Sequence, residues 1–243
     1  MKEDIHIEEP RQSQVSNNQP LIRSQVRSPH SAAIAGILFA LMRIISLVLI
    51  TSVSSPAEFS IEWLEAWTGT STVVVLLVVF SGIAFLWFTG VIRDLIGERE
   101  DHFFATIFLG SGIIYVALGF VWAAIFGALL GIYSTLTHLL VNNDIYIFGL
   151  AIMDEIGNNY ALRMAGVYMT SINTLWARAE VMPRWLIIIT YIVALGFLFF
   201  AEMLFMARYF FPAWVFLVSI YILILNYRRT HDQESEDILS QND

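Results

Sequence analysis

The chain contains no cysteine, and this absence removes several kinds of chemistry at once. It excludes disulfides, thiolate metal ligands, a cysteine nucleophile and thiol lipidation, and it leaves the redox environment undetermined. The sequence also lacks the short motifs of zinc proteases, serine hydrolases and phosphate-binding loops, and it has no aspartate-rich diphosphate motif. No catalytic, cofactor-binding or metal-ligating set emerges, so the sequence favours a non-enzymatic protein without a cofactor, while leaving enzymatic activity open.

Charged residues are scarce too, and this scarcity indicates the class of protein. They make up 14% of the chain, against about 25% in an average soluble domain, whereas 57% of the residues are hydrophobic. The net charge is −8 and lies mostly in the tails and loops, so the sequence does not indicate a nucleic-acid-binding surface. Long apolar stretches recur from Ser31 to Tyr227, and a bilayer core about 30 Å thick needs roughly 20 apolar residues per helix. The pattern predicts an all-α, polytopic transmembrane helical bundle.

We expect this bundle to occupy residues 31–229 and to cross the membrane about six times. Residues 1–30 hold too few large apolar side chains to repay the entropy of ordering a core, which predicts a disordered cytoplasmic tail. Residues 230–243 are expected to form a second disordered cytoplasmic tail, which is acidic. The expected spans are 32–53, 72–92, a third that starts after residue 102, a fourth from about residue 157, 185–205 and 212–227.

Two of the expected helices are longer than a membrane requires. Nothing breaks the helical pattern over 103–140, and such a helix is about 57 Å long at 1.5 Å per residue. Asn142, Asn143 and Asp144 then supply turn and N-cap chemistry, after which residues 145–179 run back as a second long helix. Together these helices predict a hairpin that projects from the bilayer.

The distribution of basic residues predicts the orientation, because cytoplasmic loops of membrane proteins are enriched in Lys and Arg. With a cytoplasmic N-terminus, ten basic residues fall in cytoplasmic segments and one falls in an outer loop. The ten are Lys2, Arg11, Arg23, Arg27, Arg93, Arg99, Arg178, Arg184, Arg228 and Arg229, and the one is Arg208. We therefore expect both termini in the cytoplasm.

Three charged residues lie inside the expected spans. Arg43 lies about 16 Å into the first span, where an unpartnered charge costs at least about 2.5 to 3.5 kcal/mol. Arg163 and Glu202 lie at similar depths, about 21 and 26 Å from the inner face. We expect these three residues to line one polar cavity in the outer half of the bundle. The residues expected to join them are Asp154, Glu155, Asn158, Asn159 and Asn173.

Several interpretations of this polar cluster stay open. It is either a buried ion pair that serves helix packing, as in a scaffold protein, or a site for a small anionic or lipid ligand. A small transporter or channel subunit that uses the cluster is an alternative, and a membrane-embedded enzyme that acts on lipid, with Glu202 as base, is another. A mutation of Glu202 to glutamine separates chemistry or transport from a purely structural role.

Small residues recur every four positions on the third expected helix. They are Gly119, Ala123, Gly127 and Gly131. Their spacing removes side-chain bulk from one face and lets another backbone approach closely, which predicts a helix-packing stripe. The stripe packs either within one chain or between the subunits of a homo-oligomer. The other expected partners are the membrane lipids.

Four segments of the sequence resemble a group of uncharacterised bacterial multi-pass membrane proteins. They are residues 81–94 (SGIAFLWFTGVIRD), 103–112 (FFATIFLGSG), 160–166 (YALRMAG) and 183–186 (PRWL). The resemblance covers roughly residues 70 to 225 and omits both tails. It implies a protein of the bacterial inner (plasma) membrane with about six spans, and it brings no activity with it.

Overall fold

The computed structural model describes residues 29–53, 61–96, 102–135, 143–179, 182–201 and 206–240. Within these ranges all regular structure is helical and there is no strand, so the predicted all-α class is confirmed. The elements are α1 (Pro29–Val53), α2 (Ile61–Ile96), α3 (His102–Thr135), α4 (Asn143–Asp154), η2 (Glu155–Tyr160), α5 (Ala161–Ala179), α6 (Arg184–Phe200) and α7 (Ala207–Ser240).

Four segments in the described part of the chain are long and apolar enough to cross a membrane. They are Ser31–Ser52, Gly69–Arg93, Phe103–Leu129 and Ala207–Leu225, which correspond to the first, second, third and last of the expected spans. The helix α6 is apolar but has only 17 residues. The helix α5 is less apolar, and a count of six spans therefore stays a prediction.

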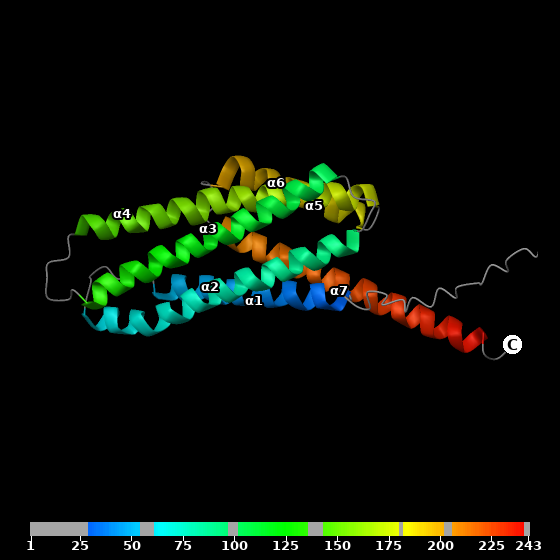
Figure 1. The fold of residues 1–243 in the computed structure, drawn as a ribbon, viewed down its shortest axis with the longest axis horizontal. Coiled ribbons are helices and arrows are strands. Elements are labelled where there is room, and N and C mark those ends of the chain that lie inside the picture. The colour runs from blue at the N-terminus through cyan, green and yellow to red at the C-terminus, as the bar shows by residue number, and fades with distance from the viewer. Residues whose placement is uncertain are drawn as a thin grey trace, which may run out of the picture.

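The helices run side by side along the long axis of the molecule (Figure 1). The elements α4, η2 and α5 follow one another without a break from Asn143 to Ala179, and this rod runs antiparallel to α3. Figure 1 also shows α7 beginning well inside one end of the bundle and extending beyond the other end, where the C-terminus lies. The segment 136–142 between α3 and α4 lies outside the described residues, and a hairpin outside the membrane stays a prediction.

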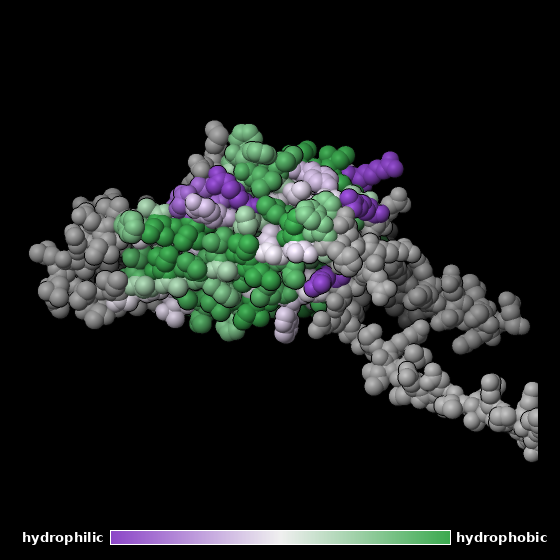
Figure 2. Space-filling model, turned by 45° about the horizontal axis from the view of Figure 1, so that its top comes forward, coloured by the Kyte–Doolittle hydropathy of each residue, from purple (hydrophilic) through white to green (hydrophobic). Residues whose placement is uncertain are grey.

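The outer surface of the bundle is more apolar than that of a soluble protein. On α1 the residues that face the interior are mostly small, such as Ala33, Ala40 and Ser46, all fully buried. The large side chains point outward: Ile34, Leu38, Leu41, Ile45 and Val48 are 47 to 63% exposed. Figure 2 shows one face on which hydrophobic residues form a broad continuous surface. An apolar surface of this extent is unfavourable in water and suits the lipid tails of a bilayer.

Aromatic side chains fill the centre of the bundle. Phe85 on α2 contacts four rings on other helices, those of Phe39, Tyr115, Tyr168 and Phe211, with centroid separations of 4.9 to 5.6 Å. These rings come from α1, α3, α5 and α7, so one cluster joins five helices. Such tilted and edge-on pairs add to the dispersion contacts that hold helices together in lipid.

Glycine allows close helix contacts at positions other than the predicted stripe. A Cβ atom on Gly166 of α5 would lie 2.9 Å from the carbonyl oxygen of Ala194 on α6. A Cβ on Gly119, Gly127 or Gly131 would meet nothing within 4 Å in the described part of the chain, while Ala123 is 2% exposed. Contact of these three glycines with a neighbouring subunit stays a prediction.

The last helix differs from the sequence prediction at both ends. It begins at Ala207, so the predicted start of the last span at residue 212 is wrong. Pro212 lies inside the helix, where membrane proteins tolerate proline because neighbouring groups satisfy the freed carbonyl. The helix continues to Ser240, in place of the disorder predicted from residue 230, and residues 230–240 contain neither glycine nor proline to end it. Residues 1–28 lie outside the described part.

Candidate functional site

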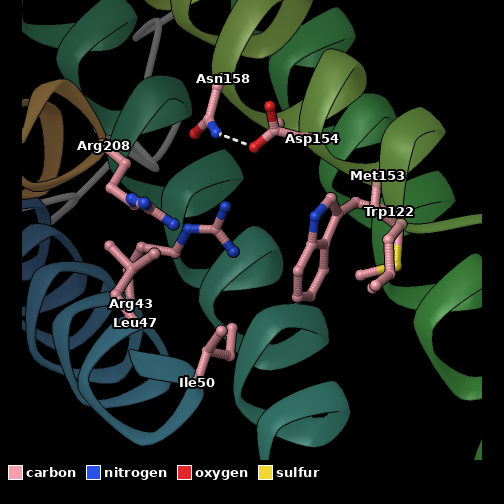
Figure 3. Close-up of a pocket in the computed structure, with 10 residues that line it drawn as sticks. Arg43, Leu47, Ile50, Trp122, Met153, Asp154, Asn158 and Arg208 are labelled. Carbon is pink, nitrogen blue, oxygen red and sulfur yellow. Dashed lines mark hydrogen bonds between the residues drawn. The ribbon is translucent and has the colours of Figure 1, made fainter. Parts of the chain in front are cut away.

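A half-open pocket of about 160 Å³ lies among α1, α3, the α4–η2 junction and the start of α7. Its lining combines charged and polar side chains with apolar ones (Figure 3). The lining residues are Arg43, Leu47, Ile50, Trp122, Leu150, Met153, Asp154, Gly157, Asn158 and Arg208.

Arg43 reaches the pocket from the middle of α1. Its side chain is half-buried and lies close enough to Tyr115 on α3 to interact with the tyrosine hydroxyl. An interaction of this kind offsets part of the cost of holding a guanidinium inside an apolar helix. Tyr115 itself is 8% exposed and belongs to the central aromatic cluster, so its position is fixed by packing. The core of the bundle therefore holds Arg43 in place.

Arg208 reaches the same pocket from the first turn of α7. Both Arg43 and Arg208 line the pocket, and Figure 3 shows their side chains on the same side of it. Two like charges at one pocket repel each other, and an anion bound there relieves that repulsion. Guanidinium groups present several N–H donors in a planar fork that matches carboxylate and phosphate oxygens. The pair is therefore suited to an anionic group.

The opposite wall comes from the α4–η2 junction. Asn158 donates a hydrogen bond from its side-chain amide to the carboxylate of Asp154, one turn earlier (Figure 3). Gly157 lies against the indole of Trp122, where a Cβ would be 3.3 Å from the ring. The residues Glu155–Tyr160 have the hydrogen-bond pattern of a π-helix, which occurs mostly as a short insertion in an α-helix and is frequent at functional sites. The wider turn places Asp154, Gly157 and Asn158 together on the pocket.

A second polar row lies on the same rod but outside the pocket lining. The side-chain amide of Asn159 donates to the Glu155 carboxylate at 2.8 Å, and Arg163 donates in turn to the amide oxygen of Asn159. The Nε of Arg163 also donates to the carbonyl oxygen of Leu198 on α6 at 3.4 Å. This row uses its hydrogen-bonding groups to join η2, α5 and α6, which is a structural task.

The structure thus divides the predicted polar cluster into two groups. Arg43, Asp154 and Asn158 meet at the pocket, whereas Glu155, Asn159 and Arg163 form the second row. Asn173 lies in neither group and donates to the carbonyl of Ile187 on α6 at 2.8 Å. Glu202 lies outside the described residues.

Three residues at or beside the site are absent from the sequence prediction. Arg208 was assigned to an outer loop because Pro212 indicated a later helix start. Tyr115 and Trp122 lie in a strongly apolar helix, where aromatic residues carry no signal of a site. Among the residues that the structure describes, no three His, Cys, Asp or Glu side chains are grouped so that they could hold a metal ion.

Comparison of the chain with protein-family models, with curated proteins and with solved structures gives no match.

Proposed function

We propose that the protein is a non-enzymatic, six-span membrane protein that binds a small anion in the pocket beside Arg43. The observation that carries this proposal is the meeting of Arg43 and Arg208, from two separate helices, at one pocket. Among the described lining residues, two carry a positive charge and only Asp154 carries a negative one. The net charge of this lining is +1, which favours an anionic ligand.

The position of α5 supports six spans rather than four. Its residues Ala165, Tyr168 and Met169 are fully buried, because α3, α6 and α7 pack around it. A helix enclosed by other helices does not have to be apolar all round, since it does not face lipid. The helix α6 has 17 residues, which gives a length of about 26 Å, close to the thickness of the hydrocarbon core.

Basic residues support a cytoplasmic position for both termini. Arg93 at the end of α2, Arg178 at the end of α5 and Arg184 at the start of α6 all flank the same side of a six-span bundle. The guanidinium of Arg178 lies 5.0 Å from the ring centroid of Phe104, near the start of α3. With the resemblance to bacterial multi-pass proteins, this arrangement leads us to propose the bacterial plasma membrane as the location.

The pocket then lies in the outer half of the membrane. From the inner ends of their helices, Arg43 is 12 residues from Ser31 and Asn158 is 20 residues from Arg178, or about 18 and 30 Å by helical rise. At these depths a ligand approaches from the outer face. Transporters usually bind their ions and substrates at helices whose backbone is interrupted near the centre of the membrane. The described residues that line this pocket belong to continuous helices, which favours ligand binding over transport.

A thermal-shift titration tests the proposal. The protein is reconstituted in nanodiscs of zwitterionic lipid and titrated with sodium acetate at constant ionic strength, with sodium chloride as the reference. Binding to the folded state raises the melting temperature, and a ligand at 100 times its Kd adds about 2.7 kcal/mol of stability. We expect a rise for the wild type and none for Arg43→Gln or Arg208→Gln.

The matched control is Arg93→Gln, which removes an exposed arginine at the other end of the bundle and should respond as the wild type does. If Arg43→Gln does not fold, Arg43→Lys takes its place, because it keeps the positive charge. Its thermal-shift response to acetate should be weaker than that of the wild type, since lysine lacks the planar fork of the guanidinium. An absent response in the wild type, or an equal response in Arg208→Gln, would refute the site.

A further inference from the structure

We infer that the natural ligand of this pocket is an amphiphilic monoanion, a small organic carboxylate or similar acid with an apolar tail, that binds with its charged end innermost. The inference rests on the proposed function and adds the chemical class of the ligand. It comes from how polar and apolar residues are ordered along the pocket, from its volume and from the charge of its lining.

The lining changes from charged to apolar along α1. Arg43, Leu47 and Ile50 follow one another on the same face, and Ile50 lies seven residues beyond Arg43, or about 10 Å along the helix axis. This direction runs toward the end of α1 at Val53, which lies on the side of the molecule away from the C-terminus (Figure 1). On α1 the apolar part of the pocket is therefore the outer part.

The opposite wall repeats the same order. The polar residues Asp154 and Asn158 lie toward η2, and Leu150 lies one turn further toward the start of α4. The start of α4 and the end of α1 lie toward the same end of the bundle, so the apolar parts of both walls coincide (Figure 1). Trp122 on α3 forms the side between the walls, and in Figure 3 it stands across the pocket from Arg43. The pocket thus has Arg43 at its inner end and the apolar residues Ile50 and Leu150 at its outer end.

The volume and charge limit the size of the ligand. A cavity of about 160 Å³ suits an acid of about eight non-hydrogen atoms, and a lipid with two acyl chains would extend well outside it. An outer-leaflet phospholipid also has the opposite orientation, with its charged group outermost. Since the described lining has a net charge of +1, one negative charge on the ligand neutralises it.

Leu150 supplies the specific test of the apolar end. It is 41% exposed at the mouth of the pocket, so replacing it does not leave a cavity in the core. Ile50 lines the same pocket from α1 and packs against the small hydrophobic cluster around Ala123 and Met153. Each methylene buried against these residues should raise the affinity about fourfold, the ratio that corresponds to the usual transfer energy of a CH₂ group.

The experiment compares acetate, hexanoate and hexylammonium with the full-length protein in zwitterionic nanodiscs, by the same thermal-shift titration. Acetate carries the charged end alone, hexanoate adds four methylenes, and hexylammonium keeps the tail with the opposite charge. We expect hexanoate to bind at least tenfold more tightly than acetate, and hexylammonium not to bind. Leu150→Ser should lower the hexanoate-to-acetate affinity ratio at least threefold.

The control variant is Leu195→Ser, which replaces an apolar residue that is 49% exposed on α6, away from the pocket, and should leave the ratio as it is. If Leu150→Ser does not fold, Ile50→Ala tests the apolar end from the α1 wall. Equal affinities for acetate and hexanoate would overturn the inference while leaving the anion site intact. Failure of both acetate and hexanoate to bind would overturn the proposed function as well. If neither Leu150→Ser nor Ile50→Ala changes the hexanoate-to-acetate affinity ratio, the tail of hexanoate binds to the surrounding lipid and the inference is wrong.

Discussion

At the scale of single residues, the polar side chains inside this bundle are held by specific partners. Trp214 donates from its indole nitrogen to the hydroxyl of Thr190 at 3.0 Å, and the hydroxyls of Thr89 and Tyr168 are 3.1 Å apart. Each bond joins two helices in a setting where water does not compete. Against this background Arg43 and Arg208 stand out, because they bring charge to a surface that a ligand can reach.

Asn173 gives the first prediction at this scale. It is 1% exposed and donates to the carbonyl oxygen of Ile187 at 2.8 Å, which ties α5 to α6. Asn173→Ala removes this bond between the two helices, so we expect a loss of about 1 kcal/mol of stability. Thermal unfolding in detergent measures the change. Ser52→Ala, which removes an exposed hydroxyl bound to its own helix, is the control, and equal melting temperatures for the two variants would contradict the prediction.

The site residues show what the sequence can and cannot predict at this scale. Arg43 and Asp154 were identified because a charge within or beside an apolar segment is itself a signal. Which of these polar residues lie together could be predicted only in part from the sequence. Helical rise gives the depth of a residue along a helix, but it does not give the direction in which the side chain points. That is why Arg163, at a suitable depth, pairs with Asn159 instead of lining the pocket. The position of Arg208 at the pocket could not be predicted, because it depends on the start of α7 at Ala207.

At the scale of helices, lengths were easier to predict than contacts. Long apolar segments reveal the approximate positions of the helices, and the rod 143–179 is close to the helix expected from residue 145. Contacts are harder because lipid-exposed and buried residues are both apolar, so hydropathy does not distinguish the two faces of a helix. The π-helical turn at Glu155–Tyr160 has no simple sequence signal either.

Two glycines provide a prediction for helix packing. Gly166→Ala places a methyl group 2.9 Å from the Ala194 carbonyl oxygen and 3.1 Å from the Cβ of Phe197, so α5 and α6 must move apart. Overpacking of this kind costs about 1 to 3 kcal/mol, more than the roughly 1 kcal/mol that alanine gains over glycine in a helix. We expect a lower melting temperature than the wild type.

Gly119→Ala is the matched substitution on α3, where a Cβ meets nothing within 4 Å. It should melt at or above the wild-type temperature in the monomeric protein, as measured by the same unfolding assay with size-exclusion chromatography to report the oligomeric state. If Gly119→Ala is instead the more damaging of the two, the small-residue stripe packs against another subunit, and the packing seen for one chain does not describe the assembled protein.

At the scale of the whole molecule, the unresolved choice is between four and six membrane crossings. Both counts place the two termini on one side, so the ends of the chain do not distinguish them. The segment between α5 and α6 does: six crossings place it in the cytoplasm, and four place everything from the end of α3 to the start of α7 outside. The basic residues Arg178 and Arg184 flank this segment and favour the cytoplasm.

The absence of cysteine makes this choice directly testable. Single cysteines are introduced as Glu180→Cys between α5 and α6, Asn142→Cys before α4 and Asp243→Cys at the C-terminus, and intact cells are treated with a membrane-impermeant maleimide. We expect Asn142→Cys to react in intact cells, and Glu180→Cys to react, like Asp243→Cys, only after permeabilisation. Because a charged loop crosses the hydrocarbon core only at high cost, the labelling reports a fixed position. Labelling of Glu180→Cys in intact cells would establish four crossings. In that case α5 and α6 lie at the outer face, and the pocket beside Arg43 is covered by helices outside the membrane.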